Sequence, residues 1–249
     1  MKANLNKRQM AMTLIEVLVV IFVIFILLSL LLPSLNTGRG HSKRSACIIN
    51  LKLVGQACHM WAGDNGNLAP SQQTVISNGW RDYLTNADQG SRCWMNYAML
   101  ADDLGPYPRL VVCPSDEREA ALSFTNGFDN SHVSYFVGVG ANDVYPQSIA
   151  GGDRNLGPGT KPDPDYGYSP KSGKGNDVAI PISGPVSWSL RMHSAGNSAG
   201  AGNILLGDGS GQRVSTASFN QDWLRNAQDS GNWPAGHVPA SPSIRLVFP

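Results

Sequence analysis

The chain has 249 residues, of which 15% are charged, and a formal net charge of +1 at pH 7. This length allows one anchor segment and one globular head of about 190 residues with its own core, and the 27 glycines and 16 prolines favour a loop-rich head over a helical bundle. Because Lys2, Lys7 and Arg8 alone exceed the net charge, the rest of the chain is net negative, which argues against nucleic-acid binding.

Residues 1–11 form a basic leader, and an apolar run follows from Met12 to Leu32 in which Glu16 is the only charged residue. A helix of this length is about 30 Å long and matches the hydrocarbon core of a bilayer. The basic leader places the N-terminus on the cytoplasmic side. The run is too long for a signal-peptide core and no small-x-small cleavage site follows it, so we expect a transmembrane anchor at about 12–32. A carboxylate at membrane depth is a functional candidate.

Residues 11–18, AMTLIEVL, resemble the N-terminal signature of type IV prepilins and type II secretion pseudopilins. The resemblance implies that a prepilin peptidase cuts between Ala11 and Met12 and that Met12 becomes the methylated N-terminus. Ala11 stands where Gly is usual in the family. Glu16 is then the fifth residue of the mature chain and pairs with the N-terminal amine of a neighbouring subunit, since an unpaired buried carboxylate is unfavourable.

The resemblance also implies that Pro33 is the helix-kinking proline of the family. Proline removes a helical hydrogen bond, and Gly38 and Gly40 weaken a helix further, so the composition predicts a kink or a soft segment here. An ordinary juxtamembrane linker is an alternative for this segment. For the apolar run itself, the alternative is a simple signal anchor with Glu16 near the headgroups.

Helical periodicity resumes at about residue 42 and continues to about residue 62, before the turn cluster GDNGN. One face of this amphipathic helix carries Cys47, Leu51, Val54, Cys58 and Trp61. We therefore expect an N-terminal helix over 12–62 and a globular extracytoplasmic head over 63–249. The predicted class is α+β and pilin-like, in which a long N-terminal helix packs on a loop-rich antiparallel β-sheet head.

The head is expected to contain short strands joined by long loops. Residues 150–185 are rich in Gly, Pro and Asp and are predicted to form a long surface loop, and 219–227 a short helix. The predicted strands are Leu110–Val112, Ser134–Val139, a hairpin of Asn203–Gly207 with Gln212–Ser215, and a last edge strand Ser243–Phe248.

A second resemblance covers much of the head. Cys47, the Cys113–Asp116 sequence CPSD, and His193 followed by Asp208-Gly209 are similar to motifs of the pilin-like proteins abundant in planctomycetes and verrucomicrobia. Those heads carry a His and, at a shorter fixed spacing, Asp-Gly; here fourteen residues lie between His193 and Asp208. The resemblance implies no particular ligand, so the role of His193, Asp208 and Gly209 stays open.

No metal-binding catalytic motif accompanies His193 and Asp208-Gly209, since H-E-x-x-H does not occur. We therefore do not expect this protein to be an enzyme. His193 is expected to be structural, bonded to the hairpin or to a backbone carbonyl, and Asp208-Gly209 to form a turn. A calcium ion in a head loop is the one cofactor that we consider, although the acidic spacing matches no calcium loop. Its candidate ligands are Asp143, Asp153, Asp163, Asp165 and Asp208.

The four cysteines are Cys47, Cys58, Cys93 and Cys113. An extracytoplasmic head permits disulfides, but Cys47 and Cys58 lie roughly 16 Å apart on one helix and cannot pair. A bridge must therefore join the helix to Cys93 or Cys113, or link those two, and four free buried thiols are equally consistent with the sequence. No C-x-x-C occurs, so we expect no zinc or other metal site.

Two classes of function remain. The first is a structural subunit of a type IV pilus-like or type II secretion pseudopilus filament. Its partners are copies of itself, other pilin-like subunits, the prepilin peptidase, the inner-membrane assembly platform and the lipid bilayer, with the head periplasmic or extracellular. The second is a membrane-anchored binding or enzymatic head, for instance one that stacks sugars on Trp80, Tyr83, Trp94 and Tyr97; we expect core packing for these aromatic residues.

Overall fold

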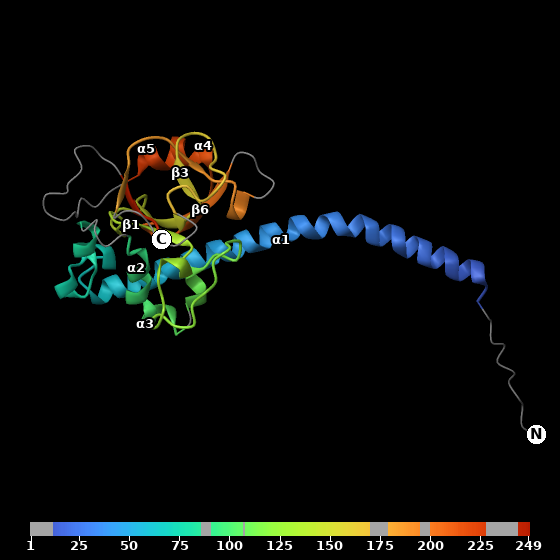
Figure 1. Ribbon diagram of the computed structural model, residues 1–249, viewed down its shortest axis with the longest axis horizontal. Helices are drawn as coiled ribbons and strands as arrows, with labels where there is room; N and C mark the ends of the chain where they lie inside the picture. Colours follow the sequence, from blue (N-terminus) through green and yellow to red (C-terminus); the bar gives the residue numbers. More distant parts are fainter. Residues whose placement is uncertain (1–11, 86–90, 107, 170–178, 195–199, 228–243) are drawn as a thin grey trace, which may run out of the picture. The chain divides into compact units, whose positions relative to one another are not determined.

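The computed structural model describes residues 12–85, 91–106, 108–169, 179–194, 200–227 and 244–249 (Figure 1). The chain divides into two compact units, Met1–Ser42 and Lys43–Pro249, and each is described by itself. The leader and the predicted cleavage after Ala11 lie outside the described residues.

Helix α1 runs from Leu14 to Asp64 and contributes to both units, so the predicted long N-terminal helix is present with nearly the expected ends. Its backbone is helical at Pro33 as well, and a kink there stays a prediction. From Leu14 to Leu30 every large apolar side chain is exposed. Within the described residues, none of the helices combines the length and the apolar character that a bilayer span requires.

The head is built on a six-stranded sheet in the order β4-β8-β1-β2-β6-β7, in which every neighbouring pair is antiparallel. A separate two-stranded sheet pairs β3 with β5. The prediction of an α+β chain with an antiparallel sheet is therefore confirmed. The strands are β1 (Tyr135–Gly138), β2 (Ile149–Asp153), β3 (Leu156–Pro158), β4 (Ile180–Ile182), β5 (Val186–Trp188), β6 (Ala201–Leu206), β7 (Gly211–Ser215) and β8 (Ile244–Val247).

Both faces of the large sheet are covered, because successive side chains of a strand point to opposite faces. Val137 and Leu205 pack into one cluster with the second part of α1. Phe136 and Ile204, their neighbours in the chain, pack into another cluster on the opposite face. That face is covered by the β3–β5 sheet and by α4 (Thr216–Ser218), a π-helical turn (Phe219–Trp223) and α5 (Leu224–Asn226) (Figure 1).

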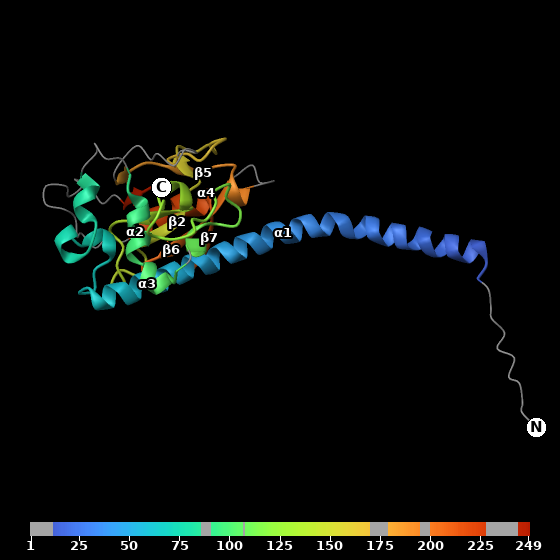
Figure 2. The ribbon, with the colours of Figure 1, turned by 60° about the horizontal axis from the view of Figure 1, so that its bottom comes forward.

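From Lys43 onward, α1 packs along β6 and the β6–β7 turn (Figure 2). Gly55 allows the close approach, since a Cβ atom there would lie 2.9 Å from Cδ1 of Leu205. Arg44 donates to the Gly202 carbonyl at 2.9 Å, and a ring nitrogen of His59 lies 3.0 Å from the Gly207 carbonyl. Four of the five predicted face residues are buried, and Cys58 is half-buried.

Short helices complete this side of the head. They are α2 (Cys93–Met99), α3 (Ala101–Leu104) and 3-10 turns at Pro70–Gln72, Val75–Ser77, Arg81–Thr85, Pro108–Val111, Asn130–His132 and Met192–Ser194. Trp80 and Tyr97 are fully buried, so their predicted core packing is confirmed. Tyr83 and Trp94 are half-buried against the same core.

Three of the predicted elements of the head are wrong. The supposed loop 150–185 contains most of β2 together with β3 and β4. Gly152 belongs to a strand because it pairs with Phe136 of β1 and Ile204 of β6. Glycine suits this position because a Cβ atom would lie 2.6 Å from the Phe136 ring and 2.8 Å from the Asn203 carbonyl oxygen. In place of the predicted strand Leu110–Val112 the chain forms a 3-10 turn, which begins at Pro108 with a fixed φ.

The last strand, β8, is an inner strand and not the predicted edge strand, because β4 pairs with its outer side. Strand β4 contains Pro181, which is tolerated at an edge, where one side of the strand has no hydrogen-bonded neighbour. The predicted hairpin is confirmed as β6 and β7, and the predicted short helix as the segment from Thr216 to Asn226.

Candidate functional site

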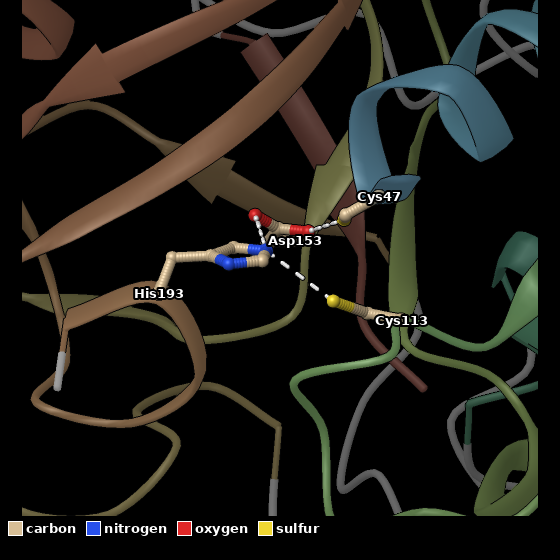
Figure 3. Close-up of side chains that lie close together, drawn as sticks. All are labelled: Cys47, Cys113, Asp153 and His193. Atoms are coloured by element: carbon tan, nitrogen blue, oxygen red, sulfur yellow. Dashed lines mark hydrogen bonds and ion pairs between the residues drawn. The ribbon is translucent and has the colours of Figure 1, made fainter. Parts of the chain in front are cut away.

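Four side chains from distant parts of the sequence meet inside the head: Cys47, Cys113, Asp153 and His193 (Figure 3). Their sulfur, oxygen and nitrogen atoms all lie within 4.8 Å of one another. All four side chains are buried, none with more than 1% of its surface exposed. Among the residues that the structure describes, this is the only group of His, Cys, Asp or Glu side chains with such geometry.

The contacts inside the cluster join all four residues. The Cys47 thiol donates to Oδ1 of Asp153 at 3.0 Å, and Sγ of Cys113 lies 3.2 Å from Nε2 of His193. The same His193 nitrogen lies 3.4 Å from Oδ2 of Asp153 (Figure 3). A thiol, a second sulfur, an imidazole and a carboxylate thus face one another with no other side chain between them.

Asp153 is fixed by the sheet. It is the last residue of β2, opposite Tyr135 in the register of β1. Its Oδ2 accepts a hydrogen bond of 2.7 Å from the backbone N–H of Asn203 on the neighbouring strand β6. The Tyr135 hydroxyl lies 3.5 Å from Sγ of Cys47 and so contacts the cluster from the same strand pair.

Cys113 is fixed by the turn that it begins. The Asp116 N–H donates to the Cys113 carbonyl at 2.9 Å, and the Ser115 N–H points at Sγ of Cys113 at 3.4 Å. The Asp116 carboxylate forms a bidentate ion pair of 2.7 and 2.8 Å with Arg154, and both side chains are buried. Because Arg154 follows Asp153 in the chain, this ion pair sets the position of Cys113 relative to Asp153.

His193 lies in the 3-10 turn Met192–Ser194, which is attached to β6. The Ser194 hydroxyl donates to the Ala201 carbonyl at 3.1 Å and accepts from the Ala201 N–H at 2.7 Å. Met192 has φ +56°, a left-handed conformation that is uncommon for a residue other than glycine and that is enriched at functional sites. Nδ1 of His193 has no hydrogen-bond partner among the described residues.

The buried environment shifts the pKa values of the cluster in different directions. Burial raises the pKa of Cys47 well above its ordinary value and raises the pKa of Asp153. Burial also acts to raise the pKa of Cys113, but hydrogen bonds from Cys47 and His193 lower it to about 7. Burial acts to lower the pKa of His193, but the charge of Asp153 and the contact with Cys113 raise it. Cys113 is therefore the thiol of the cluster that loses its proton more readily.

A thiolate beside a histidine is the arrangement of a cysteine nucleophile, but burial excludes this use of the cluster as the structure stands. Cys113 and the His193 side chain are each only 1% exposed, so a substrate from solvent has no access to the sulfur. A thiolate, a second cysteine, an imidazole and a carboxylate are also the donors that bind zinc in proteins. Metal binding needs no substrate access, so it is the chemistry that the geometry allows.

The sequence analysis named all four residues but did not bring them together. Cys47, Cys113 and His193 belonged to the second resemblance, and Asp153 was only a calcium candidate. The expectation that His193 bonds the hairpin or a carbonyl is wrong, since it contacts Cys113 and Asp153. No sequence spacing signals the cluster, because its members come from α1, a turn, a strand end and a 3-10 turn.

Asp208 and Gly209 form the β6–β7 turn, as predicted. Asp208 accepts from the Ser210 N–H at 2.8 Å, and Gly209 has φ +79°. The histidine whose charge acts on Asp208 is His59 of α1, which also contacts Gly207. The His193-to-Asp208 spacing of the sequence therefore does not correspond to a contact between these two side chains.

The remaining predicted site residues lie apart from one another. All four cysteines are free thiols, and Cys93 donates to the Val247 carbonyl at 3.3 Å. Asp143 accepts from the Val144 N–H, and Asp163 accepts from the Asp165 N–H, so each is engaged within its own loop. Within the described part of the chain, the acidic residues proposed for calcium do not form a common site.

At the start of α1, Thr13 and Glu16 form a capping box, which the sequence analysis missed although the T-x-x-E spacing signals it. The Thr13 N–H and hydroxyl donate to Oε2 of Glu16 at 2.7 and 2.9 Å, and the Glu16 N–H points at the Thr13 hydroxyl at 3.4 Å. Glu16 therefore has a structural role in helix initiation. Oε1 of Glu16 has no hydrogen bond within the described residues.

Comparison with known proteins gives no match to a family model, to a curated protein or to a solved structure.

Proposed function

We propose that this chain is a pilin-like subunit of a type IV pilus-like or type II secretion pseudopilus filament. The leader is removed between Ala11 and Met12, the new N-terminus is methylated, and the first part of α1 anchors the chain in the inner membrane before assembly. Its partners are copies of itself, other pilin-like subunits, the prepilin peptidase and the assembly platform. In this role the chain is structural and not an enzyme.

One observation carries the proposal. From Leu14 to Leu30, α1 is apolar on all sides and exposed, and its only acidic residue is Glu16 in the first turn. A helix that is apolar all round is stable only when lipid or other helices cover it. A filament core of packed N-terminal helices provides that cover, and the basic leader that precedes the helix fits insertion with the N-terminus in the cytoplasm.

The capping box adds a reason for the position of Glu16. Oε2 accepts both hydrogen bonds from Thr13, so the carboxylate is held at the start of the helix while Oε1 stays available to a second donor. In a dry filament core, a carboxylate needs a cation, and the N-terminal amine of Met12 on an adjacent subunit can supply it. This pair would set the axial register between subunits.

Three variants separate the cap from the charge. Glu16→Gln keeps a residue that serves in a capping box but removes the negative charge. Glu16→Ala removes both, and Thr13→Ala removes the cap partner but keeps the charge. We expect Glu16→Gln and Glu16→Ala to be processed and membrane-inserted yet missing from sheared filaments, and Thr13→Ala to assemble, with a helix weakened by about 0.5–2 kcal/mol.

The readouts are electron microscopy and immunoblotting of sheared surface material, and mass spectrometry of the mature N-terminus. The expected N-terminal residue is a methylated Met12. Filaments of Glu16→Gln at the wild-type level would rule out the charge pair, and a chain that retains Met1 would rule out processing. If the wild-type protein enters no filament, the proposed role fails.

A further inference from the structure

We propose that Cys47, Cys113, Asp153 and His193 bind one zinc ion, which attaches α1 to the head. This goes beyond the filament role, since it concerns a metal site within a single chain. The cluster is enclosed, all of its ligand atoms lie within 4.8 Å of one another, and three of its four residues sit outside α1.

The distances between ligand atoms are slightly shorter than those of a tetrahedral zinc site. Zinc bonds of about 2.3 Å to sulfur and about 2.0–2.1 Å to nitrogen or oxygen place neighbouring ligand atoms roughly 3.3–3.8 Å apart. Sγ of Cys47 lies 3.0 Å from Oδ1 of Asp153, and Sγ of Cys113 lies 3.2 Å from Nε2 of His193, so both separations are a few tenths of an ångström shorter than this range. Small outward movements of side chains that already face one another would therefore admit the ion.

The donor set selects the metal. Two sulfurs and an imidazole disfavour calcium and magnesium, which prefer oxygen ligands, and match zinc. Four protein ligands without an open position are typical of structural zinc sites and not of catalytic ones. Zinc replaces the proton of each cysteine thiol, the released protons pass to solvent, and no oxidation or reduction occurs.

The surrounding contacts suit a bound ion. The Asn203 N–H holds Oδ2 of Asp153, which leaves Oδ1 as the ligand atom, and the Ser115 N–H can stabilise the Cys113 thiolate. Zinc with two thiolates and one carboxylate carries one net negative charge. Arg44, which bonds Gly202 and the Asn203 side chain, supplies a positive charge nearby.

The mechanical consequence follows from where the ligands lie. Cys47 belongs to α1, whereas the other three ligands belong to a turn, a strand end and a 3-10 turn of the head. One ion therefore joins four chain segments at the face where the helix meets the sheet. Because a preformed site is absent from the unfolded chain, zinc binding would stabilise the folded head.

The test uses the full-length chain, purified in mild detergent under reducing conditions without chelator and supplied with zinc. We expect one zinc per chain by elemental mass spectrometry. After exchange, cobalt(II) should show the visible bands of tetrahedral coordination and the near-ultraviolet band of thiolate-to-cobalt charge transfer. Cys113→Ser and His193→Gln should each reduce bound zinc to background.

Cys58→Ser is the matched control, because Cys58 is a half-buried thiol on the same helix as Cys47 but outside the cluster; it should retain full zinc. If the cluster variants do not fold, thermal unfolding of the wild-type chain decides: chelator should lower its melting temperature, and added zinc should restore it. Three results would overturn the proposal: no zinc uptake by the reduced chain, a melting temperature that does not depend on chelator, or a Cys47–Cys113 disulfide as the resident state. None of these readouts depends on filament formation.

Discussion

The ion pair between Asp116 and Arg154 shows how one contact can position a whole site. Both side chains are buried, and the Arg154 guanidinium also lies 3.5 Å above the Tyr166 ring. Neither charge has access to solvent, so each depends on the other. Burial acts to raise the pKa of Asp116, but the hydrogen bonds and charge of Arg154 hold it below its ordinary value of 3.8.

We predict that Asp116→Asn destabilises the head by about 3–5 kcal/mol at neutral pH, because it leaves Arg154 buried and uncompensated. The pKa of Asp116 is lower in the folded chain than in the unfolded one, so the ionised carboxylate stabilises the fold above pH 3.8. That contribution is lost as the pH falls further, toward the folded-state value. Urea unfolding of the wild-type chain and of Asp116→Asn should therefore give a difference in the free energy of unfolding that shrinks as the pH falls below 3.8.

Glu117→Gln serves as the control, because Glu117 forms an ion pair with Arg191 in which both side chains are about half exposed. We expect it to change the free energy of unfolding by less than about 1 kcal/mol. Equal effects of Asp116→Asn and Glu117→Gln on the free energy of unfolding would show that burial of the Asp116–Arg154 pair does not increase its contribution to stability.

At the scale of elements, the contact between α1 and the β6–β7 turn depends on a glycine. A Cβ atom at Gly55 would lie 2.9 Å from a Leu205 methyl and 3.3 Å from Cα of Gly209. The methyl can move, but the backbone of the turn cannot without disturbing the sheet. Gly63, on the same helix, has no atom within 4 Å of such a Cβ.

We predict that Gly55→Val destabilises the head by about 1–3 kcal/mol through overpacking, whereas Gly63→Val is neutral or stabilising by a few tenths of a kcal/mol because valine is the better helix former. Thermal and urea unfolding of the two variants measure the difference. A Gly55→Val protein as stable as Gly63→Val would mean that the helix does not approach the turn this closely.

At the scale of the whole molecule, the two units differ in what buries their apolar side chains. The buried core of the head includes α1 residues from Cys47 onward, while the large apolar side chains of 14–30 are exposed. The head therefore has a core that does not depend on the first unit. Exposed apolar surface of this kind is typical of segments that lipid or other chains cover.

We predict that a chain beginning at Lys43 is folded, soluble without detergent and monomeric, with a melting temperature within about 5 °C of that of the full chain. A chain beginning at Lys52 loses buried Cys47 and Leu51 and should be strongly destabilised, since deletion of each large core side chain costs about 2–5 kcal/mol. Size-exclusion chromatography and circular dichroism distinguish these outcomes. Aggregation of the chain that begins at Lys43 would contradict the prediction that the head folds without the first unit.

Local sequence patterns were sufficient to predict the elements whose signal lies within a short stretch of the chain. The period of apolar residues from Cys47 to Trp61 predicted the buried face of α1, and the β-branched and aromatic residues around Tyr135 predicted β1. The glycine-rich turn at Asp208 predicted the β6–β7 hairpin. Each of these signals is contained within one element, so no knowledge of the rest of the fold was needed.

Only the tertiary structure decided the elements and the site that depend on distant neighbours. Gly152 is a strand residue because it pairs with β1 and β6, and β8 is an inner strand because β4 pairs beside it. Cys47, Cys113, Asp153 and His193 form one cluster because a helix, a turn, a strand end and a 3-10 turn meet there. The sequence determined which residues carry the chemistry, but their mutual distances follow from long-range packing, which no local spacing encodes.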